Sequence, residues 1–190
     1  MEVTGIVLAG GQGRRMGGMD KGLVEFRGRP MVYHVLQRLK PQVDGLLLNA
    51  NRAIDIYSQF GYPVISDSIP GFAGPLAGLQ SGMTHADTPL VAMVPCDAPL
   101  LPDDLVSRLL EALQMHGADL ACVRTGRWQQ PAFCLCRTAL LPDLTRFLQG
   151  GGRKVGAWYA SLNCVEVAFD DQAGAFANIN TPEELACLDQ

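Results

Sequence analysis

A glycine-rich segment near the N-terminus, AGGQGRRMGGMDKG at residues 9–22, combines residue types that suit phosphate binding. Glycine has no Cβ, so the backbone N–H groups of Gly10, Gly11 and Gly13 can approach a polyphosphate closely. Ordering so many glycines costs conformational entropy, which a bound anion would offset. The positive charge beside these amides comes from Arg14, Arg15 and Lys21. The segment therefore predicts a polyphosphate-binding loop.

Two well-known phosphate-binding motifs do not fit this loop. A Walker motif needs Gly-Lys followed by Ser or Thr, but Lys21 is preceded by Asp20 and followed by Gly22. The dinucleotide motif G-x-G-x-x-G places Met16 where its third glycine belongs. The acidic residue that would bind a ribose after the second strand is also replaced, by Asn49. NAD binding is therefore not expected.

Polar residues follow several apolar runs of the chain. They are Asn49 in LLLNAN, Asp67 in VISDS and Asp97 in MVPCDAP. In an open parallel sheet ligands bind beyond the carboxyl ends of the strands, so these residues and Gly10 should converge on one crevice. A carboxylate beside a polyphosphate is normally matched by a hard divalent cation, which makes Asp97 a predicted Mg²⁺ ligand. Asn and Asp also begin turns after strands, which is the alternative explanation for each position taken alone.

The sequence nominates no covalent nucleophile. The three histidines, His34, His85 and His116, lie in or at the ends of predicted helices, where packing or surface roles are expected. Cys96 adjoins Asp97, but alternation along a strand points the two side chains apart. A glycine loop, a lysine and a cation site together favour chemistry at phosphorus, in which catalysis is mainly positioning and charge neutralisation.

The elements that must position these residues alternate along the chain. Apolar runs of strand length lie at residues 3–9, 45–50, 62–66, 89–95 and 118–123, and helical patterns at 30–40, 53–61, 75–86 and 102–117. Pro102 suits the first turn of the last helix and Gly117 its end. Such alternation predicts a doubly wound α/β fold, a mostly parallel sheet with helices on both faces. Two strand-like runs around Gly126 predict a hairpin that adds a small antiparallel part.

Length, charge and cysteine usage limit the remaining possibilities. A chain of 190 residues favours one domain over residues 1–190. A net charge of −4 argues against a general nucleic-acid binder. No signal peptide or membrane span is apparent, so a cytoplasmic protein is expected. The six cysteines lack the spacing of zinc sites, and Cys134 and Cys136 should pack on one face of a strand.

The motifs taken together resemble a known family. The segment LAGGQGRRMGGMDKGL resembles the signature L-x-G-G-x-[SG]-x-R-M-G-x-x-K of nucleotidyltransferases, which transfer an NMP from an NTP to a phosphate-bearing acceptor. LLLNAN, VISDS, GPLAGL, PCDAPLL and NINTPEEL extend the likeness, in the same order, to the molybdenum cofactor guanylyltransferases, the MobA family. The resemblance implies a Rossmann-like nucleotidyltransferase fold. It also implies transfer of GMP from GTP to the phosphate of molybdopterin, with release of pyrophosphate.

The same resemblance implies roles for particular residues. The implied nucleotide contacts are Leu8, Ala9, Gly10, Lys21, Asn49, Asp67, Gly74, Gly78 and Asp97, with Asp97 as the Mg²⁺ ligand. The predicted nucleotide site also includes Gly11 and Gly13 of the glycine-rich loop. The implied acceptor contacts are Arg153, Lys154, Asn178 and Asn180. Family analogy adds partner proteins that deliver the cofactor or mature molybdoenzymes. No partner that is a nucleic acid or a membrane is expected.

These residues suggest a mechanism in which Lys21, Arg15, the loop amides and Mg²⁺ on Asp97 neutralise the triphosphate. The acceptor phosphate would attack the α-phosphorus in line, and because it is already an anion it needs no general base. Asp67 could accept hydrogen bonds from the guanine N1–H and N2–H₂ edge. A cytidylyltransferase or sugar-phosphate nucleotidyltransferase of the same fold, or a non-catalytic nucleotide-binding carrier, stays an alternative.

Overall fold

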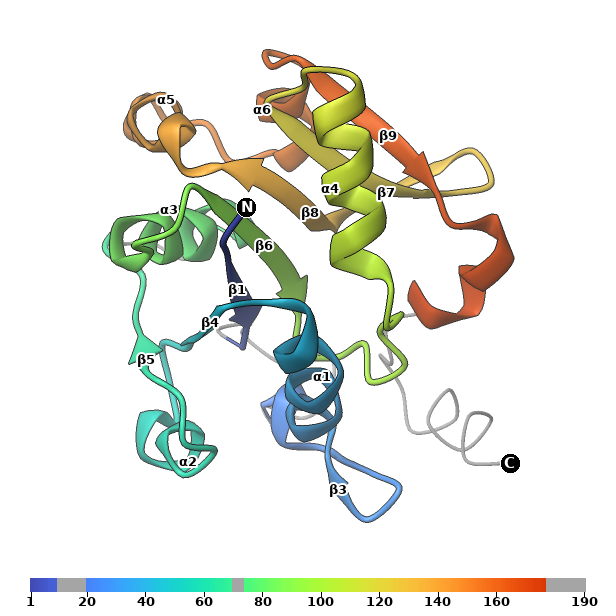
Figure 1. The fold of residues 1–190 in the computed structure, drawn as a ribbon. Helices are drawn as coiled ribbons and strands as arrows, with labels where there is room; N and C mark the ends of the chain where they lie inside the picture. The colour runs from blue at the N-terminus through green and yellow to red at the C-terminus, as the bar shows by residue number, and fades with distance from the viewer. Residues whose placement is uncertain (10–19, 70–73, 177–190) are drawn as a thin grey trace.

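The computed structural model describes residues 1–9, 20–69 and 74–176, and its centre is a seven-stranded sheet. Across the sheet the strands run in the order β5 (Val64–Ile65), β4 (Gly45–Asn49), β1 (Val3–Leu8), β6 (Leu90–Pro95), β8 (Trp128–Arg137), β7 (Leu120–Thr125) and β9 (Cys164–Ala168). The first four are mutually parallel. The predicted doubly wound, mostly parallel sheet is thus confirmed (Figure 1).

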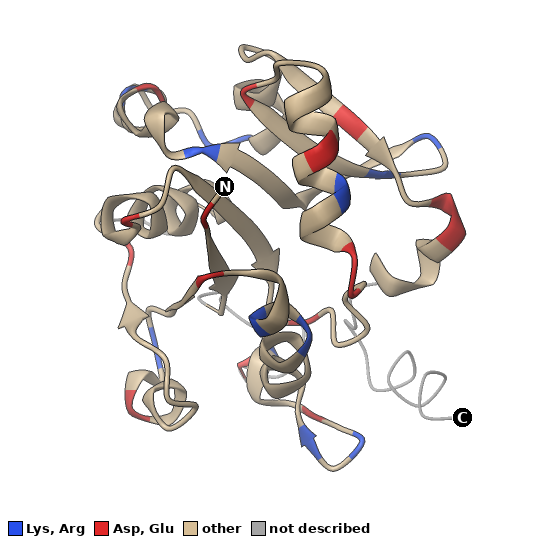
Figure 2. Ribbon diagram, viewed as in Figure 1, with Lys and Arg blue, Asp and Glu red and all other residues tan. Residues whose placement is uncertain are grey.

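The central strands are almost entirely apolar, because both faces of the sheet are covered. Strands β1, β4 and β6 contain no Lys, Arg, Asp or Glu, and Figure 2 shows the charged residues on the helices, loops and outer strands instead. Successive side chains of a strand point to opposite faces, so β1 packs Val7 on one side of the sheet and Ile6 on the other. A sheet buried on both faces needs such continuous apolar runs.

The helices form one layer on each face of the sheet (Figure 1). Helices α1 (Met31–Leu39) and α4 (Leu105–Met115) contribute to the core on one face. Helices α3 (Pro75–His85), α5 (Leu141–Gln149) and α6 (Val155–Tyr159) contribute to the core on the other. The short helix α2 (Ile54–Ser58) lies between β4 and β5 in the chain and buries Tyr57. Short 3-10 helices cover Lys21–Leu23, Lys40–Gln42, Thr138–Leu140 and Asp170–Phe176.

The antiparallel part of the sheet is a hairpin of β7 and β8 that turns at Gly126, as predicted. Gly126 has φ 56°, a left-handed conformation that favours glycine. Strand β8 lies between β6 and β7, antiparallel to both, rather than at an edge. Strand β9, parallel to β7, and the two-stranded sheet of β2 (Glu25–Phe26) and β3 (Arg29–Pro30) were not predicted.

Helix α4 begins three residues later than the predicted first turn at Pro102. Asp104 has φ −110° and ψ 11°, so the regular helix begins at Leu105. The side chain of Gln42 accepts a hydrogen bond from the backbone N–H of Val106 at 2.9 Å and so satisfies a donor of the first turn. The predicted end is confirmed, because Gly117 has φ 58° and follows the C-cap residue His116.

Four of the five described cysteines are buried, as predicted for most of them, and Cys164 is half-buried. Cys134 and Cys136 belong to the core on the face of α3, α5 and α6, and Cys122 joins them. The Sγ atoms of Cys122 and Cys164 lie 3.8 Å apart. In the described part of the chain, no three or more His, Cys, Asp or Glu side chains group as metal ligands. The same part contains no helix with the length and apolarity that a membrane crossing requires.

Candidate active site

The carboxyl ends of β1, β4 and β6 meet at one edge of the sheet. Leu8 is in register with Asn49 on one side and with Pro95 on the other. Beyond these pairs the backbone N–H of Ala9 donates to the carbonyl of Asn49 at 2.8 Å, and that of Cys96 donates to the carbonyl of Leu8 at 3.0 Å. The sheet therefore places the end of β1 between Asn49 and the segment that carries Asp97, as the sequence predicted.

Lys21 and Asp97 form an ion pair at this edge. The Nζ atom of Lys21 lies 3.3 Å from Oδ2 of Asp97, although 76 positions separate the two residues. The Asp97 side chain is 11% exposed and that of Lys21 is 25% exposed, so the pair is largely shielded from solvent. Lys21 opens a short 3-10 helix, and Asp97 follows β6 by two residues. Lys21 and Asp97, which were both predicted to lie around a triphosphate, are thus in direct contact.

Asp20, directly before Lys21, is held by two hydrogen bonds. Its Oδ1 atom accepts from the hydroxyl of Tyr57 at 2.5 Å and from the backbone N–H of Gly22 at 3.3 Å. Burial raises the pKa of Asp20, against the opposing effects of Tyr57, Gly22 and the nearby Arg52. Burial also raises the pKa of Tyr57, so that its hydroxyl stays a donor. These contacts fix the backbone that carries Lys21.

A second group of polar side chains surrounds Asp67. Asn49 donates from Nδ2 to Oδ1 of Asp67 at 3.0 Å, and Asn51 donates to Oδ2 at 2.9 Å. Asn51 also accepts from the backbone N–H of Asp67 at 2.8 Å. Asn49 is buried and Asp67 is half-buried, so the carboxylate is oriented by amides from the end of β4. The predicted convergence of Asn49 and Asp67 is a direct contact.

The start of helix α3 packs against the polar side chains around Asp67. Gly74 caps the helix with φ 76°, which favours glycine. A Cβ on Gly78 would lie 2.4 Å from Oδ1 of Asn49 and 2.6 Å from Cδ2 of Leu8, so only glycine fits there. The side chain of Ser81 accepts from the backbone N–H of Ser68 at 2.9 Å and ties the residue after Asp67 to α3.

Of the predicted acceptor residues, the structure describes Arg153 and Lys154. Arg153 donates from Nη1 to the carbonyl of Leu148, in the last turn of α5, and to that of Gly152, in the loop that joins α5 to α6. Lys154 is the residue before α6. The structure thus engages Arg153 with its own loop rather than with Asp97 or Asp67. The predicted site residues outside the described ranges are Gly10, Gly11, Gly13, Arg14, Arg15, Asn178 and Asn180.

The donor set around Asp97 fits Mg²⁺. This cation keeps several waters and is usually held by one or two carboxylates together with substrate phosphates. One largely buried carboxylate at the sheet edge matches that pattern, whereas a site that needed three protein ligands would not. The neighbouring Cys96 is not a competing ligand, because burial raises the pKa of its thiol and its side chain packs into the core of the α1 and α4 face.

Sequence reasoning missed three residues that shape this edge: Asp20, Asn51 and Tyr57. Asn51 stood in the LLLNAN segment, where its position two residues after Asn49 places both side chains on one side of the chain. Asp20 stood beside Lys21 in the glycine-rich segment. Tyr57 had no comparable signal, because it reaches Asp20 from a helix that the sequence alone does not orient.

Comparison with known proteins shows where this chain belongs. Residues 5–164 match the MobA-like NTP transferase domain. A molybdenum cofactor guanylyltransferase from Cupriavidus taiwanensis is 53% identical over 189 residues, which are 97% of this chain and 94% of that protein. A similar protein from Ralstonia nicotianae, also named molybdenum cofactor guanylyltransferase, is 51% identical over 98% of this chain and 96% of its own.

The solved structures give the same fold. Molybdopterin-guanine dinucleotide biosynthesis protein A from Archaeoglobus fulgidus has a TM-score of 0.81 at 23% identity and covers 98% of this chain and 96% of its own. With its sheet edge, its ion pair and these matches, the chain is a member of the MobA-like NTP transferase family.

Proposed function

We propose that this protein transfers GMP from GTP to the phosphate of molybdopterin, forming the guanine dinucleotide cofactor and releasing pyrophosphate. The observation that carries the proposal is the shielded pair of Lys21 and Asp97 where β1, β4 and β6 end. Relatives about half identical over nearly the whole chain carry the name of this activity. A cytoplasmic location and protein partners that supply the pterin belong to the same proposal.

Lys21 supplies the positive charge in this proposal. An ammonium group on a flexible stem is a compact point charge that can bind a phosphate oxygen. The Nζ atom of Lys21 lies 3.3 Å from Asp97. A bound triphosphate would either replace the carboxylate as the partner of the ammonium group or bind the ammonium group together with it. Charge on the leaving pyrophosphate grows in the transition state, so a fixed cation there lowers the barrier. The sequence adds Arg15 and the backbone amides of the glycine-rich segment to this set.

Asp97 would hold Mg²⁺ together with phosphate oxygens of the nucleotide. When bound, Mg²⁺ neutralises charge on the phosphates and orients them for displacement. The acceptor phosphate of molybdopterin is already an anion at neutral pH, so no residue of the chain has to remove a proton from it. The work of the protein is then to position two anionic substrates and to compensate their charge.

Asp67 is the proposed determinant of the base. Guanine presents two N–H donors on one edge, and a carboxylate offers matching acceptors. The amides of Asn49 and Asn51 hold this carboxylate in a fixed orientation, which is what a site that reads hydrogen bonds requires. Cytosine presents a different edge, so the same carboxylate would select against CTP.

A panel of nucleotides tests the proposal. The purified protein is incubated with Mg²⁺, molybdopterin and each NTP in turn, and the product is identified by mass. Because a hydrogen bond to a charged group contributes about 1.5–3 kcal/mol, kcat/KM for GTP should exceed that for CTP by at least about tenfold. Preference for CTP would favour a cytidylyltransferase of the same fold. Nucleotide binding without turnover would favour a non-catalytic carrier.

Substitution of Gly78 tests whether Asn49 and Asp67 form the base site. In Gly78→Ala the new methyl group must displace Asn49 and with it the amide that orients Asp67. We expect the dissociation constant of GTP to rise about tenfold and the free energy of unfolding to fall by about 1–3 kcal/mol. Calorimetric titration with GTP and thermal unfolding measure the two effects.

Gly156→Ala is the matched control for this substitution. It adds the same methyl group in helix α6, where nothing lies within 4 Å of the new Cβ. GTP affinity should stay unchanged, and stability should rise by up to about 1 kcal/mol because alanine favours helix. If Gly78→Ala bound GTP as tightly as Gly156→Ala, the base site would have to lie elsewhere.

A further inference from the structure

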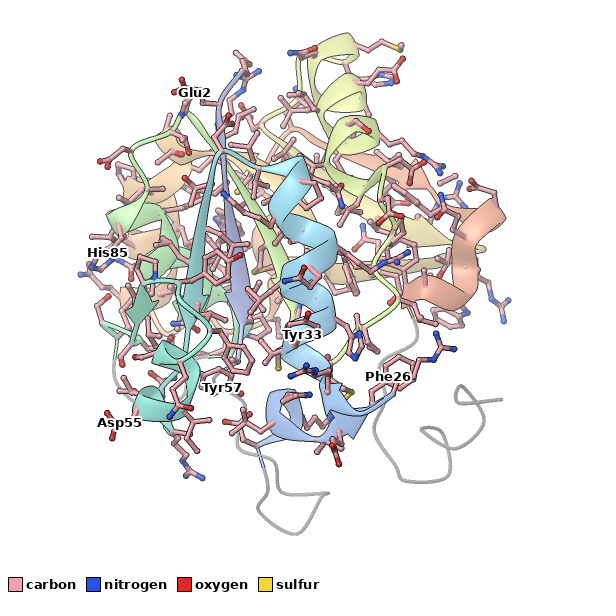
Figure 3. All side chains as sticks on the ribbon, turned by 60° about the horizontal axis from the view of Figure 1, so that its bottom comes forward. Glu2, Phe26, Tyr33, Asp55, Tyr57 and His85 are labelled. Atoms are coloured by element: carbon pink, nitrogen blue, oxygen red, sulfur yellow. The ribbon has the colours of Figure 1, made fainter. Side chains whose placement is uncertain are left out.

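Tyr57 is a fully buried tyrosine whose hydroxyl is directed at a carboxylate rather than at the backbone. Its exposed fraction is 0%, and it comes from α2, a helix of five residues between β4 and β5. Figure 3 labels Tyr57 beside α2, at the end of the molecule that the view brings forward. The hydroxyl donates to Oδ1 of Asp20 at 2.5 Å, across 37 positions of the chain.

The carboxylate that Tyr57 reaches caps the turn that carries Lys21. Asp20 precedes the 3-10 helix Lys21–Leu23, and its Oδ1 also accepts from the backbone N–H of Gly22. A side-chain oxygen that binds a free N–H at the start of a helical turn fixes the turn's backbone. Lys21 is the first residue of this turn, so the position of its Cα depends on the cap.

The turn is also packed directly against Tyr57. A Cβ added to Gly22 would lie 2.6 Å from the hydroxyl oxygen of Tyr57 and 3.0 Å from Sγ of Cys96. The turn therefore rests between α2 and the end of β6 with no room for a side chain at Gly22. Cys96 is the residue before Asp97, so the same contact relates the backbone of Lys21 to that of its ion-pair partner.

We infer that Tyr57 is a positioning residue for Lys21, acting through Asp20 to hold the lysine ammonium where it meets Asp97 and the nucleotide triphosphate. The inference rests on the proposed function. The side chain of lysine is a flexible four-carbon stem, so it does not fix the position of its own ammonium group. The position of the ammonium group therefore depends on the backbone that carries it as well as on the contact with Asp97. A small misplacement of a charged group lowers the rate strongly. Tyr57 touches no reacting atom in this arrangement.

A double-mutant cycle tests this assignment. Tyr57→Phe keeps the buried ring and removes the hydrogen bond to Asp20. In the protein with Lys21 we expect kcat for GMP transfer to fall about tenfold, because a displaced ammonium group stabilises the transition state less well. In the Lys21→Ala protein the same change should alter kcat by less than about twofold, because the group that Tyr57 positions is gone.

Tyr159→Phe is the matched control. Tyr159 is 2% exposed, and its hydroxyl donates one hydrogen bond, to the carbonyl of Pro131 at 2.8 Å, on the opposite face of the sheet. This variant loses an equivalent buried hydroxyl and should keep its kcat. Thermal unfolding of all variants shows whether a loss of kcat is accompanied by a loss of stability.

A second variant serves if Tyr57→Phe does not fold. Asp20→Ala removes the oxygen that accepts from Tyr57 and Gly22. Its kcat should fall in the presence of Lys21 and stay the same in the Lys21→Ala protein. Equal losses of kcat in both backgrounds, or a loss no larger than that of Tyr159→Phe, would overturn the inference. A wild-type protein that forms no guanine dinucleotide product would instead refute the proposed function.

Discussion

Asp97→Asn is expected to lower kcat for GMP transfer by about 10²–10³, the usual cost of removing one fixed electrostatic group from an active site. Asparagine keeps the shape of the side chain but loses the charge that Mg²⁺ requires. It also releases Lys21 from its carboxylate partner, so GTP should bind at least as tightly as before. The loss therefore falls on kcat and on the Mg²⁺ requirement rather than on GTP affinity.

Pyrophosphate release at saturating GTP, measured over a series of Mg²⁺ concentrations, checks this expectation. Asp103→Asn is the control, because Asp103 is 73% exposed and pairs with Arg38 at 3.5 Å on the surface. Such a pair contributes little, so turnover should change by less than about twofold. Near-normal turnover of Asp97→Asn, with a fold that melts like the wild type, would remove Asp97 from the mechanism.

Lys21→Ala should also lower turnover by about 10²–10³, but with a different division between binding and rate. Loss of the ammonium leaves the largely buried carboxylate of Asp97 without its partner. The triphosphate also loses a cation that would bind it, so the KM for GTP should rise while kcat falls. Asp97→Asn and Lys21→Ala are thus distinguishable although they break the same ion pair.

Steady-state kinetics with varied GTP separate the two effects. Lys40→Ala is the control for charge, because Lys40 is exposed at the end of α1. Lys21→Arg tests geometry, since a planar guanidinium does not replace a point charge at a close contact. An unchanged KM and kcat in Lys21→Ala would show that the cation acts elsewhere.

The edge of the sheet was predictable because its signal is local. Each strand there is an uninterrupted apolar run followed by a polar residue, as in β4 with Asn49 and in the segment after β6 with Asp97. Parallel strands with crossover helices bring such ends together whatever the details of packing. The contact of Asn49 with Asp67 follows from this rule, as does the position of Asp97 next to the end of β1.

The place of β8 was not predictable from the hairpin signal. Gly126 indicates a turn between two strands, but nothing near it says which other strand the hairpin joins. That choice depends on pairing between distant residues, such as Met93 with Cys134. Strand β9 was missed for a related reason, because Cys164–Ala168 is short, only half-buried and interrupted by Glu166.

Contacts among side chains were the least accessible to sequence reasoning. Residues 53–61 were predicted as a helix, and the structure forms α2 at Ile54–Ser58 within that range. The helical pattern does not specify that Tyr57 faces Asp20, since this depends on how α2 packs against the end of the sheet. Asn51 bonds to Asp67 only because β4 and β5 are neighbours.

The late position of β8 in the chain has a consequence for protein synthesis. Strand β6 ends at Pro95, and the residues of β8 that pair with it are Cys134–Arg137. About 40 more residues must therefore be synthesised before this edge of β6 can pair with β8. At about 5–20 residues per second, the growing chain exposes that apolar border for about 2–8 s on the ribosome. An uncovered strand can pair with a neighbouring nascent chain. Elongation rate between Pro95 and Cys134 therefore sets how long each new molecule is open to misassembly.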